Sequence, residues 1–469
     1  MKTIIWKLYG QLINVMSSLI RIGTCCLSCV IVTSCNNPIP DEEITLTSKK
    51  YVLNEFGQIT STNFSAEDFE PPKNCKECHP NHYQEWSESM HAYAMEDPIF
   101  FSGWEQAQHD YPETGERFCV QCHSPVAFLT GEDLSDYSTS EELLESDLPE
   151  QIKAGISCDI CHSITSLSQT VHTDNNLAAV ADYHLYPGEG IKIGSIQNPE
   201  SNEHHESEYN PIFTRSELCL PCHDMTIRGV EAEITFTEWS RIPGLAMSGE
   251  LSCQDCHMKQ KNDGTHDHHF TGVDINLSYP MEESPLYNKI EELLQSAVYI
   301  KFGYYNFALP DSISKGETLT IPVAVSSLTA HAIPSGTSFS REAWLELVIR
   351  NDQGNILYQS GVIEDNSEPL DLSDVDLLLF TTQLMGENEE SVNSIINAYS
   401  IINNSLPAFS DRYHQYNYDV VNDYNFLIVK VRMRFRSFKP YILNGHPDLL
   451  SNLPVFEMES ICDTIYFKQ

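Results

Sequence analysis

Five cysteine pairs in this 469-residue chain follow one pattern. In each pair two residues separate the cysteines, and a histidine directly follows the second cysteine. Two thiols at this spacing can form thioether bonds to both vinyl groups of one haem, and the adjacent imidazole then lies beneath the iron as its proximal ligand. The five segments are CKECH from Cys75, CVQCH from Cys119, CDICH from Cys158, CLPCH from Cys219 and CQDCH from Cys253.

Disulfides, zinc ribbons and thioredoxin-like redox sites are the other common uses of paired cysteines. None of them explains a histidine after every pair. With 18 histidines in 469 residues, five such positions would all hold histidine by chance with a probability on the order of one in ten million. The sequence therefore predicts five covalently bound haem c groups. They would be attached through Cys75, Cys78, Cys119, Cys122, Cys158, Cys161, Cys219, Cys222, Cys253 and Cys256, with His79, His123, His162, His223 and His257 as proximal ligands.

A further histidine follows the first motif on a predicted helix. Pro80 suits the first turn of a helix, and apolar residues recur at helical spacing over residues 83–94. His91 comes twelve residues after His79, about 18 Å along a helix, which is too far to reach the same haem. We expect His91 to ligate a different haem; a histidine at the surface or at the edge of the core is the alternative.

CKECHPNHYQEWSESMHA, residues 75–92, resembles the first haem segment of a multihaem cytochrome c family. This family includes the tetrahaem electron carrier of ammonia oxidisers and, more distantly, hydroxylamine oxidoreductase-like enzymes. The likeness extends to about residue 275, and FTEWSRIPGLAMSGELSCQDCHM resembles the segment before a late haem. In that family a histidine in the S-x-H-A context, here His91, is the distal ligand of a later haem. Five motifs instead of four are a departure from the family pattern.

The same resemblance suggests further distal ligands. HHESEYNPIFTRSELCLPCHD resembles the family's run of a histidine, a short loop and a helix that enters a motif, which favours His205, with His204 as the alternative. HDHHFTGVD resembles the H-x-F-x-G ending and favours His269. His172, ten residues beyond His162, is also predicted as a ligand.

The haem attached at Cys119 has no histidine nearby in the following sequence. None occurs between Ser124 and Gly155. Its distal ligand must therefore come from a distant part of the chain.

The first 35 residues have the composition of an export signal. They carry Lys2, Lys7 and Arg21 but no acidic residue, and an uncharged run ends in VTSC. VTSC resembles a bacterial lipobox, which implies lipidation at Cys35; an uncleaved membrane anchor is the alternative. Residues 36–70 would form a tether. We therefore expect an exported, periplasmic or outer-membrane lipoprotein that is bound to the membrane through a lipid anchor at Cys35.

The chain is strongly acidic. Twenty-seven Lys and Arg residues against 67 Asp and Glu residues give a formal charge of −40. This charge argues against nucleic acid and anionic membrane surfaces as direct partners. The expected partners are other redox proteins, either cytochromes or quinol-linked donors.

The C-terminal third differs from the rest of the chain in its motifs and in its pattern of apolar residues. No C-x-x-C-H motif follows His257, and from about residue 298 β-rich runs alternate with turn signals such as NDQGN. In residues 426–436 the apolar residues would face one side of a strand and the lysine and arginine residues the other. The charged side is either a solvated face or a surface that meets haem propionates. This layout predicts a β-sandwich of about 170 residues.

LTAHAIPSGTSFSREAWLELVI resembles the GHxxPTG segment of β-domains attached to similar cytochromes, with Ala330 where glycine is usual. The resemblance implies that His331 supplies a distal ligand across a domain interface; an ordinary loop histidine is the alternative. The predicted fold class is α+β: a mainly α-helical multihaem cytochrome c domain at residues 71–285, followed by a β-sandwich domain at residues 298–469.

Five haems within residues 75–257 would leave little protein between one macrocycle and the next. Two histidines on each iron leave no open coordination position, so such haems carry electrons without binding substrate. The sequence therefore predicts electron transfer along a row of mostly bis-histidine haems, and no catalytic residue is predicted. The alternative is a multihaem reductase of a small nitrogen or sulfur oxyanion, which needs one five-coordinate haem.

Overall fold

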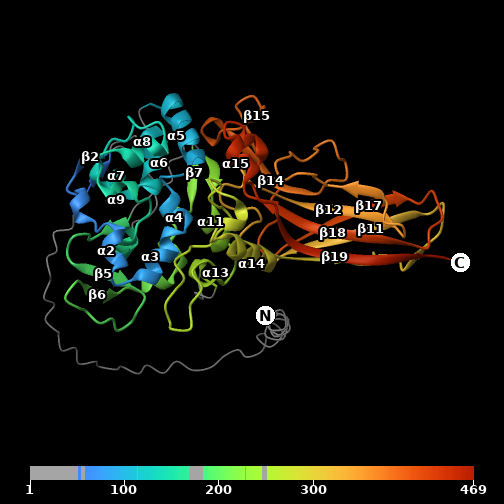
Figure 1. Ribbon diagram of the computed structural model, residues 1–469, viewed down its shortest axis with the longest axis horizontal. Helices are drawn as coiled ribbons and strands as arrows, with labels where there is room; N and C mark the ends of the chain where they lie inside the picture. Colours follow the sequence, from blue (N-terminus) through green and yellow to red (C-terminus); the bar gives the residue numbers. More distant parts are fainter. Residues whose placement is uncertain are drawn as a thin grey trace, which may run out of the picture. The chain divides into compact units, whose positions relative to one another are not determined.

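Short helices make up much of the N-terminal part of the structure, a computed structural model that describes residues 51–53, 59–112, 115–167, 183–227, 229–245 and 251–468 (Figure 1). Residues 48–469 form one unit and residues 1–47 another. The predicted signal at residues 1–35, Cys35 and His172 lie outside the described residues. Within those ranges, no helix combines the length and the apolar run that crossing a membrane requires.

The helices of this part are brief, and several begin at a proline. The α-helices are α2 (Pro72–Lys76), α3 (Pro80–Ser87), α4 (Met90–Tyr93), α5 (Pro98–Asp110), α6 (Gly115–His123), α7 (Pro125–Thr130), α8 (Ser140–Glu145), α9 (Glu150–Lys153), α10 (Cys158–His162), α11 (Thr235–Ser240), α13 (Cys253–His257) and α14 (Tyr287–Ala297). The 3-10 helices are η1 (Ala66–Asp68), η2 (Pro211–Thr214), η3 (Ser216–Leu218) and η4 (Met281–Glu283). Pro80, Pro98 and Pro125 each occupy a first turn, where a missing backbone N–H costs nothing.

Four two-stranded ladders accompany these helices. They pair β1 (Tyr51–Leu53) with β2 (Ile59–Thr62), β3 (Ile164–Leu167) with β4 (Tyr183–Leu185), β5 (Ile191–Gly194) with β6 (Glu206–Tyr209), and β7 (Met225–Ile227) with β8 (Val230–Glu233). A buried cluster that includes Phe69, Trp104 and Phe128 holds the helices together. The N-terminal part is therefore helical with short strands, and the chain as a whole has the mixed α+β content that the sequence predicts.

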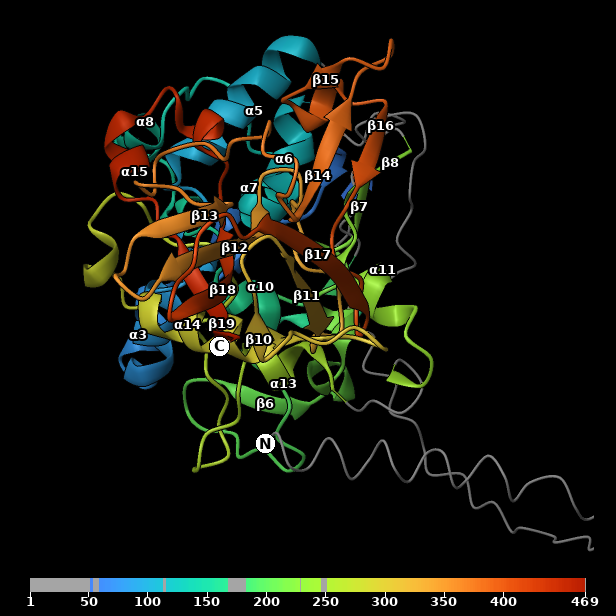
Figure 2. The ribbon, with the colours of Figure 1, turned by 90° about the vertical axis from the view of Figure 1, so that its right-hand side faces the viewer.

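The C-terminal part is built from two sheets. Its elements are β9 (Val298–Phe302), β10 (Ser312–Ile313), β11 (Thr318–Ser327), β12 (Glu342–Asn351), β13 (Ile356–Ser360), β14 (Leu379–Met385), β15 (Ser391–Val392), η5 (Ile395–Asn397), β16 (Ser400–Asn403), β17 (Asp411–Asp419), β18 (Phe426–Arg436), η6 (Pro440–Leu443), α15 (Pro447–Ser451) and β19 (Phe456–Phe467). One sheet has the order β10-β19-β18-β12-β14-β15, with β13 and β16 on its flanks, and the other has the order β17-β11-β9. Figures 1 and 2 show β12, β18 and β19 side by side.

Both sheets contribute to one hydrophobic core. Val323 of β11, Leu347 of β12 and Val431 of β18 are fully buried in the same cluster. Leu347 lies opposite Val431 in the antiparallel register of β12 and β18, so their side chains share a face. α14 packs on this core through Ile290 and Leu294. The predicted boundary between residues 285 and 298 therefore lies in a region where helix and sheet share a core.

Strand β18 alternates as the sequence predicts, but its charged side is not a simple solvated face. β18 lies between β12 and β19, in the interior of the sheet. Arg432 pairs with Glu346, its cross-strand neighbour, and Arg436 is fully buried against Glu342. Carboxylates on β12 make this possible, because a buried guanidinium needs a partner of opposite charge.

Candidate functional site

Each C-x-x-C-H motif lies in a helix or a tight turn. α10 and α13 coincide with the third and fifth motifs, and α6 ends at His123. Residues three apart lie on one face of a helix, so the two thiols of a motif point in one direction. All ten motif cysteines are free of disulfide bonds.

Four of the five proximal histidines face a second imidazole at almost the same distance. The members of each pair come from distant segments of the chain. The ring centres are 6.3 Å apart for His79 and His205, for His223 and His91, and for His257 and His331, and 6.4 Å apart for His162 and His268.

This spacing fits one metal ion between two imidazoles. Two metal–nitrogen bonds of about 2 Å each, and about 1 Å from each nitrogen to its ring centre, add up to roughly 6 Å. Rings that packed directly on each other would lie closer, as His123 and Phe100 do at 3.8 Å. The four pairs are therefore suited to hold haem iron between them.

Hydrogen bonds to backbone carbonyls fix the orientation of most of these rings. A carbonyl oxygen only accepts, so the ring nitrogen beside it must carry the proton, which leaves Nε2 available to a metal. In five rings Nδ1 donates to a backbone oxygen. The bonds run from His162 to Ile193 O (2.7 Å), from His257 to Thr271 O (2.6 Å), from His268 to His266 O (2.8 Å), from His205 to Glu206 O (3.0 Å) and from His331 to Ala332 O (3.0 Å).

Burial keeps the imidazoles neutral. It lowers the pKa of His91 to about 3 and the pKa values of His123, His257 and His268 to about 4. Only a neutral imidazole has a lone pair to offer a metal. These rings are therefore in the ligating form at neutral pH.

His91 is held by a chain of contacts at the start of α4. Trp86 Nε1 donates to Ile156 O at 2.8 Å, and Ile156 N donates to His91 O at 3.1 Å. Gly155 has a φ of +64°, and a Cβ on it would lie 2.4 Å from His91 O. His91 Nδ1 is buried and makes no hydrogen bond. Nδ1 of His91 is therefore free of competing hydrogen bonds.

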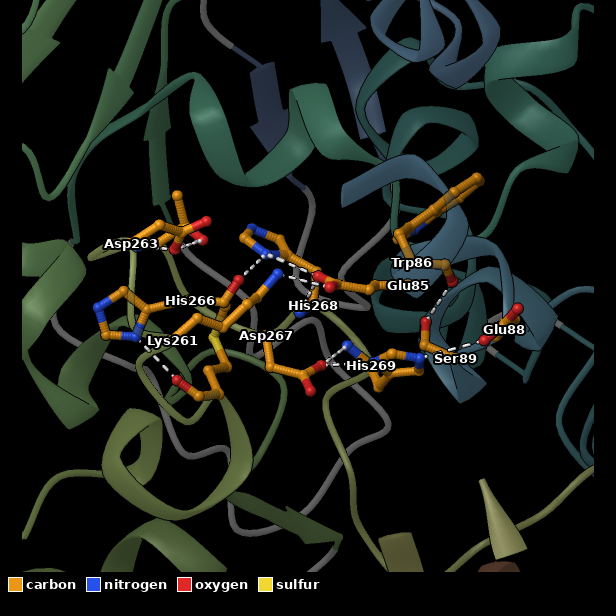
Figure 3. Close-up of polar contacts among 12 residues, drawn as sticks. Glu85, Trp86, Glu88, Ser89, Lys261, Asp263, His266, Asp267, His268 and His269 are labelled. Carbon is orange, nitrogen blue, oxygen red and sulfur yellow. Dashed lines mark hydrogen bonds and ion pairs between the residues drawn. The ribbon is translucent and has the colours of Figure 1, made fainter. Parts of the chain in front are cut away.

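Two neighbouring histidines have different surroundings (Figure 3). Asp267 Oδ1 lies 2.5 Å from His269 Nδ1, and Glu88 Oε2 lies 3.1 Å from His269 Nε2. Both ring nitrogens of His269 are therefore occupied by carboxylates, whereas His268 faces His162. The sequence predicts His269 as a ligand, but the imidazole that faces a motif histidine in the structure is His268. Which of the two binds haem iron stays a prediction. The adjacent pair in HDHHF was the signal for this site.

Helix α3 fixes the segment that carries His268. Glu85 accepts a hydrogen bond from His268 N at 3.0 Å and pairs with Lys261 Nζ at 2.5 Å. His82, Glu85 and His268 also bring three potential metal ligands within 4.8 Å of one another. Because Glu85 is already neutralised by Lys261 and His268 faces His162, this cluster is best explained as a support for His268.

His123 has a different neighbour. Its ring stacks on Phe100, and its Nδ1 donates to Ala94 O at 3.2 Å. Among the residues that the structure describes, no second imidazole faces it across the distance seen in the four pairs. His172, predicted as a distal ligand, lies outside the described residues.

The remaining predicted ligands lie as follows. His91, His205 and His331 each face a proximal histidine, at His223, His79 and His257 respectively. His204 is exposed beside Glu203, so His205 takes the position opposite the first motif.

Cysteines of different motifs also meet. The thiols of Cys75 and Cys158 lie side by side, so that each shifts the pKa of the other. The same contact joins Cys122 with Cys222, and Cys219 with Cys253. Motifs that are far apart in sequence are therefore neighbours in space.

The comparison with known families defines the class. A family model described as cytochrome c554 and c-prime matches residues 74–163, which contain the first three motifs. This match and the motifs support a multihaem c-type cytochrome with covalently bound haem.

A solved structure extends the likeness over most of the chain. It is a penta-heme cytochrome c552 from Thermochromatium tepidum, with a TM-score of 0.61 and 18% sequence identity over 85% of this chain and 99% of that one. The two chains therefore share a fold. The CARDB domain of a Pyrococcus furiosus protein covers 37% of this chain and 86% of its own at 10% identity, and its TM-score of 0.17 is too low to indicate a common fold. No curated protein matches the sequence.

Proposed function

We propose that this protein is an exported pentahaem c-type cytochrome that transfers electrons. The observation that carries the proposal is the set of four imidazole pairs, each spaced for one iron. Haem supplies one-electron redox chemistry when bound. The ten motif cysteines would attach five haems. The N-terminal haem domain would be followed by a β-sandwich whose two sheets enclose one hydrophobic core.

The proposed axial ligands follow from the pairs. His205 would serve the first motif, His268 the third, His91 the fourth and His331 the fifth. Two imidazoles at an iron leave no position for a substrate, so these four sites are suited to electron transfer.

The contacts between cysteines support an order for the attachment sites. The first and third motifs adjoin through Cys75 and Cys158, and the fourth and fifth adjoin through Cys219 and Cys253. Cys161 lies near Cys222, which would link the third motif to the fourth. The row therefore runs from the first motif through the third and fourth to the fifth. The second motif joins as a branch at the fourth through Cys122.

Export and membrane attachment are part of the proposal. They rest on the basic and apolar composition of residues 1–35 and on the VTSC sequence that ends at Cys35. Redox proteins, such as cytochromes or quinol-linked donors, would exchange electrons with the chain. A formal charge of −40 favours partners with a basic docking face.

A reductase of a small nitrogen or sulfur oxyanion is the second candidate function. It is favoured by His123, which faces no second imidazole among the described residues. A five-coordinate iron at the second motif would have room for a small ligand.

The test uses the mature protein from a host that attaches c-type haem. Mass spectrometry should show five haems on the polypeptide, and spectra of the ferric protein should show at least four low-spin haems. Carbon monoxide uptake by one haem, unchanged in His172→Ala, would support the reductase, and loss of a low-spin haem in that variant would make His172 the missing ligand. A mass with fewer haems, or several haems that bind carbon monoxide, contradicts the electron-carrier proposal.

A further inference from the structure

The loop that carries His331 contacts a helix of the N-terminal part. This loop joins β11 to β12, and the helix is α11. Glu238 Oε2 accepts a hydrogen bond from Ala332 N at 3.0 Å and a second from Ser335 Oγ at 2.6 Å. One carboxylate oxygen of α11 therefore binds the residue next to His331 and the loop that follows.

Three more hydrogen bonds hold the same loop. Thr235 Oγ1 lies 2.8 Å from Ser335 Oγ. Arg341 donates to Asp274 Oδ2 at 2.6 Å and to Ser335 O at 2.5 Å. Thr235 and Asp274 both belong to the part of the chain that carries the motifs, so the loop is fastened along its length.

The partial burial of Glu238 makes these hydrogen bonds important for its stability. Its side chain is half-buried, and burial raises its pKa, whereas the bonds from Ser335 and Ala332 lower it. A carboxylate that loses water is stable only when donors replace the water. In the structure, the loop supplies those donors in the same conformation that brings the His331 ring to 6.3 Å from the His257 ring.

We propose that Glu238 is a positioning residue that holds His331 opposite His257, so that six-coordination at the fifth motif depends on this contact between α11 and the β11–β12 loop. The proposal rests on the proposed function, in which His331 is the distal ligand of the fifth haem. Glu238 acts through the backbone N–H of Ala332 and the hydroxyl of Ser335.

The test compares variants of the full-length haem-loaded protein. Glu238→Ala removes the acceptor, and Glu238→Gln keeps an oxygen that can accept both bonds. Glu231→Gln is the matched control, because Glu231 is exposed and its side chain pairs with Arg241 at the surface. His331→Ala is the reference for a lost ligand. The measurements are the number of high-spin ferric haems by electron paramagnetic resonance and the number of haems that bind carbon monoxide when reduced.

We expect Glu238→Ala to gain a high-spin haem that binds carbon monoxide, at the same site as His331→Ala, in a substantial fraction of molecules. Glu238→Gln should stay close to the control, and the double variant Glu238→Ala/His331→Ala should equal His331→Ala. An unchanged spin state in Glu238→Ala, with the gain present in His331→Ala, overturns the positioning role alone. An unchanged spin state in His331→Ala instead overturns the proposed ligation.

Ser335→Ala covers the case in which Glu238→Ala fails to fold. It removes one donor and leaves the carboxylate in place. The fraction of molecules whose fifth haem binds carbon monoxide should then be higher than in Glu231→Gln. Equal fractions in the two variants contradict the proposal.

Discussion

The ring of His268 lies 6.4 Å from the ring of His162, with an angle of 23° between the ring planes. His269, the next residue, is instead held between Asp267 and Glu88. Adjacent histidines therefore have separate roles, one as a proposed ligand and the other as part of a carboxylate network.

This difference gives a prediction with a built-in control. His268→Ala should convert one low-spin ferric haem to high spin, because the iron of the third motif loses an axial imidazole. His269→Ala should leave the number of low-spin haems unchanged, since its nitrogens already bind carboxylates. Electron paramagnetic resonance of the two variants measures both. The opposite pattern would restore His269 as the ligand.

The contact between Gly155 and His91 yields a second prediction. In Gly155→Ala the new Cβ would lie 2.4 Å from His91 O, at a φ of +64° that alanine rarely adopts. We expect a loss of stability of about 1–3 kcal/mol and a partial shift of the haem at the fourth motif to high spin. Thermal unfolding and the ferric spectrum report these effects. Gly103→Ala on α5 is the control, because a Cβ there meets nothing within 4 Å and should be neutral or stabilising.

Asp97 provides a prediction about pH. Asp97 accepts a hydrogen bond from Ile99 N at 2.9 Å as the N-cap of α5, and burial raises its pKa to about 6. An acid whose pKa rises on folding lowers stability as the pH increases from its unfolded value, about 4, to its folded value. Asp97→Asn keeps the cap without this cost. It should gain on the order of 1 to 3 kcal/mol over the wild type between pH 4 and pH 6.

Denaturant unfolding at several pH values checks this expectation. Glu105→Gln, at an exposed position of the same helix, serves as the control for loss of one negative charge. A constant difference between Asp97→Asn and the wild type from pH 4 to pH 7 would contradict the assignment.

The shared core of the two sheets can be tested by truncation. Leu347 is fully buried in that core, whereas Leu372 is 76% exposed. Leu347→Ala should lower the free energy of unfolding by about 2–5 kcal/mol through lost burial and a residual cavity. Leu372→Ala should change it by less than about 0.5 kcal/mol. Equal effects of the two substitutions, measured by denaturant unfolding, would show that this core does not limit stability.

Local spacing made the motifs predictable, because two thiols and an imidazole within five residues define a chemical function by themselves. The alternation of buried and charged residues in β18 was predictable because it also depends only on residues that are close in sequence. Partners fixed by tertiary contacts were not. The position of His268 depends on Glu85 of α3, that of His269 depends on Glu88, the residue after α3, and the burial of Arg436 depends on Glu342 of β12. The stacking of Phe100 on His123 likewise has no signal in the sequence around either residue.

Every imidazole pair joins segments that are far apart along the chain. His79 cannot meet its partner until residue 205 has been synthesised, and His257 must await residue 331. Contacts between residues so far apart in sequence must close large loops. The entropy lost on loop closure slows folding. Three of the four pairs are complete by residue 268, whereas His257 meets its partner only after the β-rich part has folded. Haem at the fifth motif would therefore be the last of the four to gain a second imidazole during maturation.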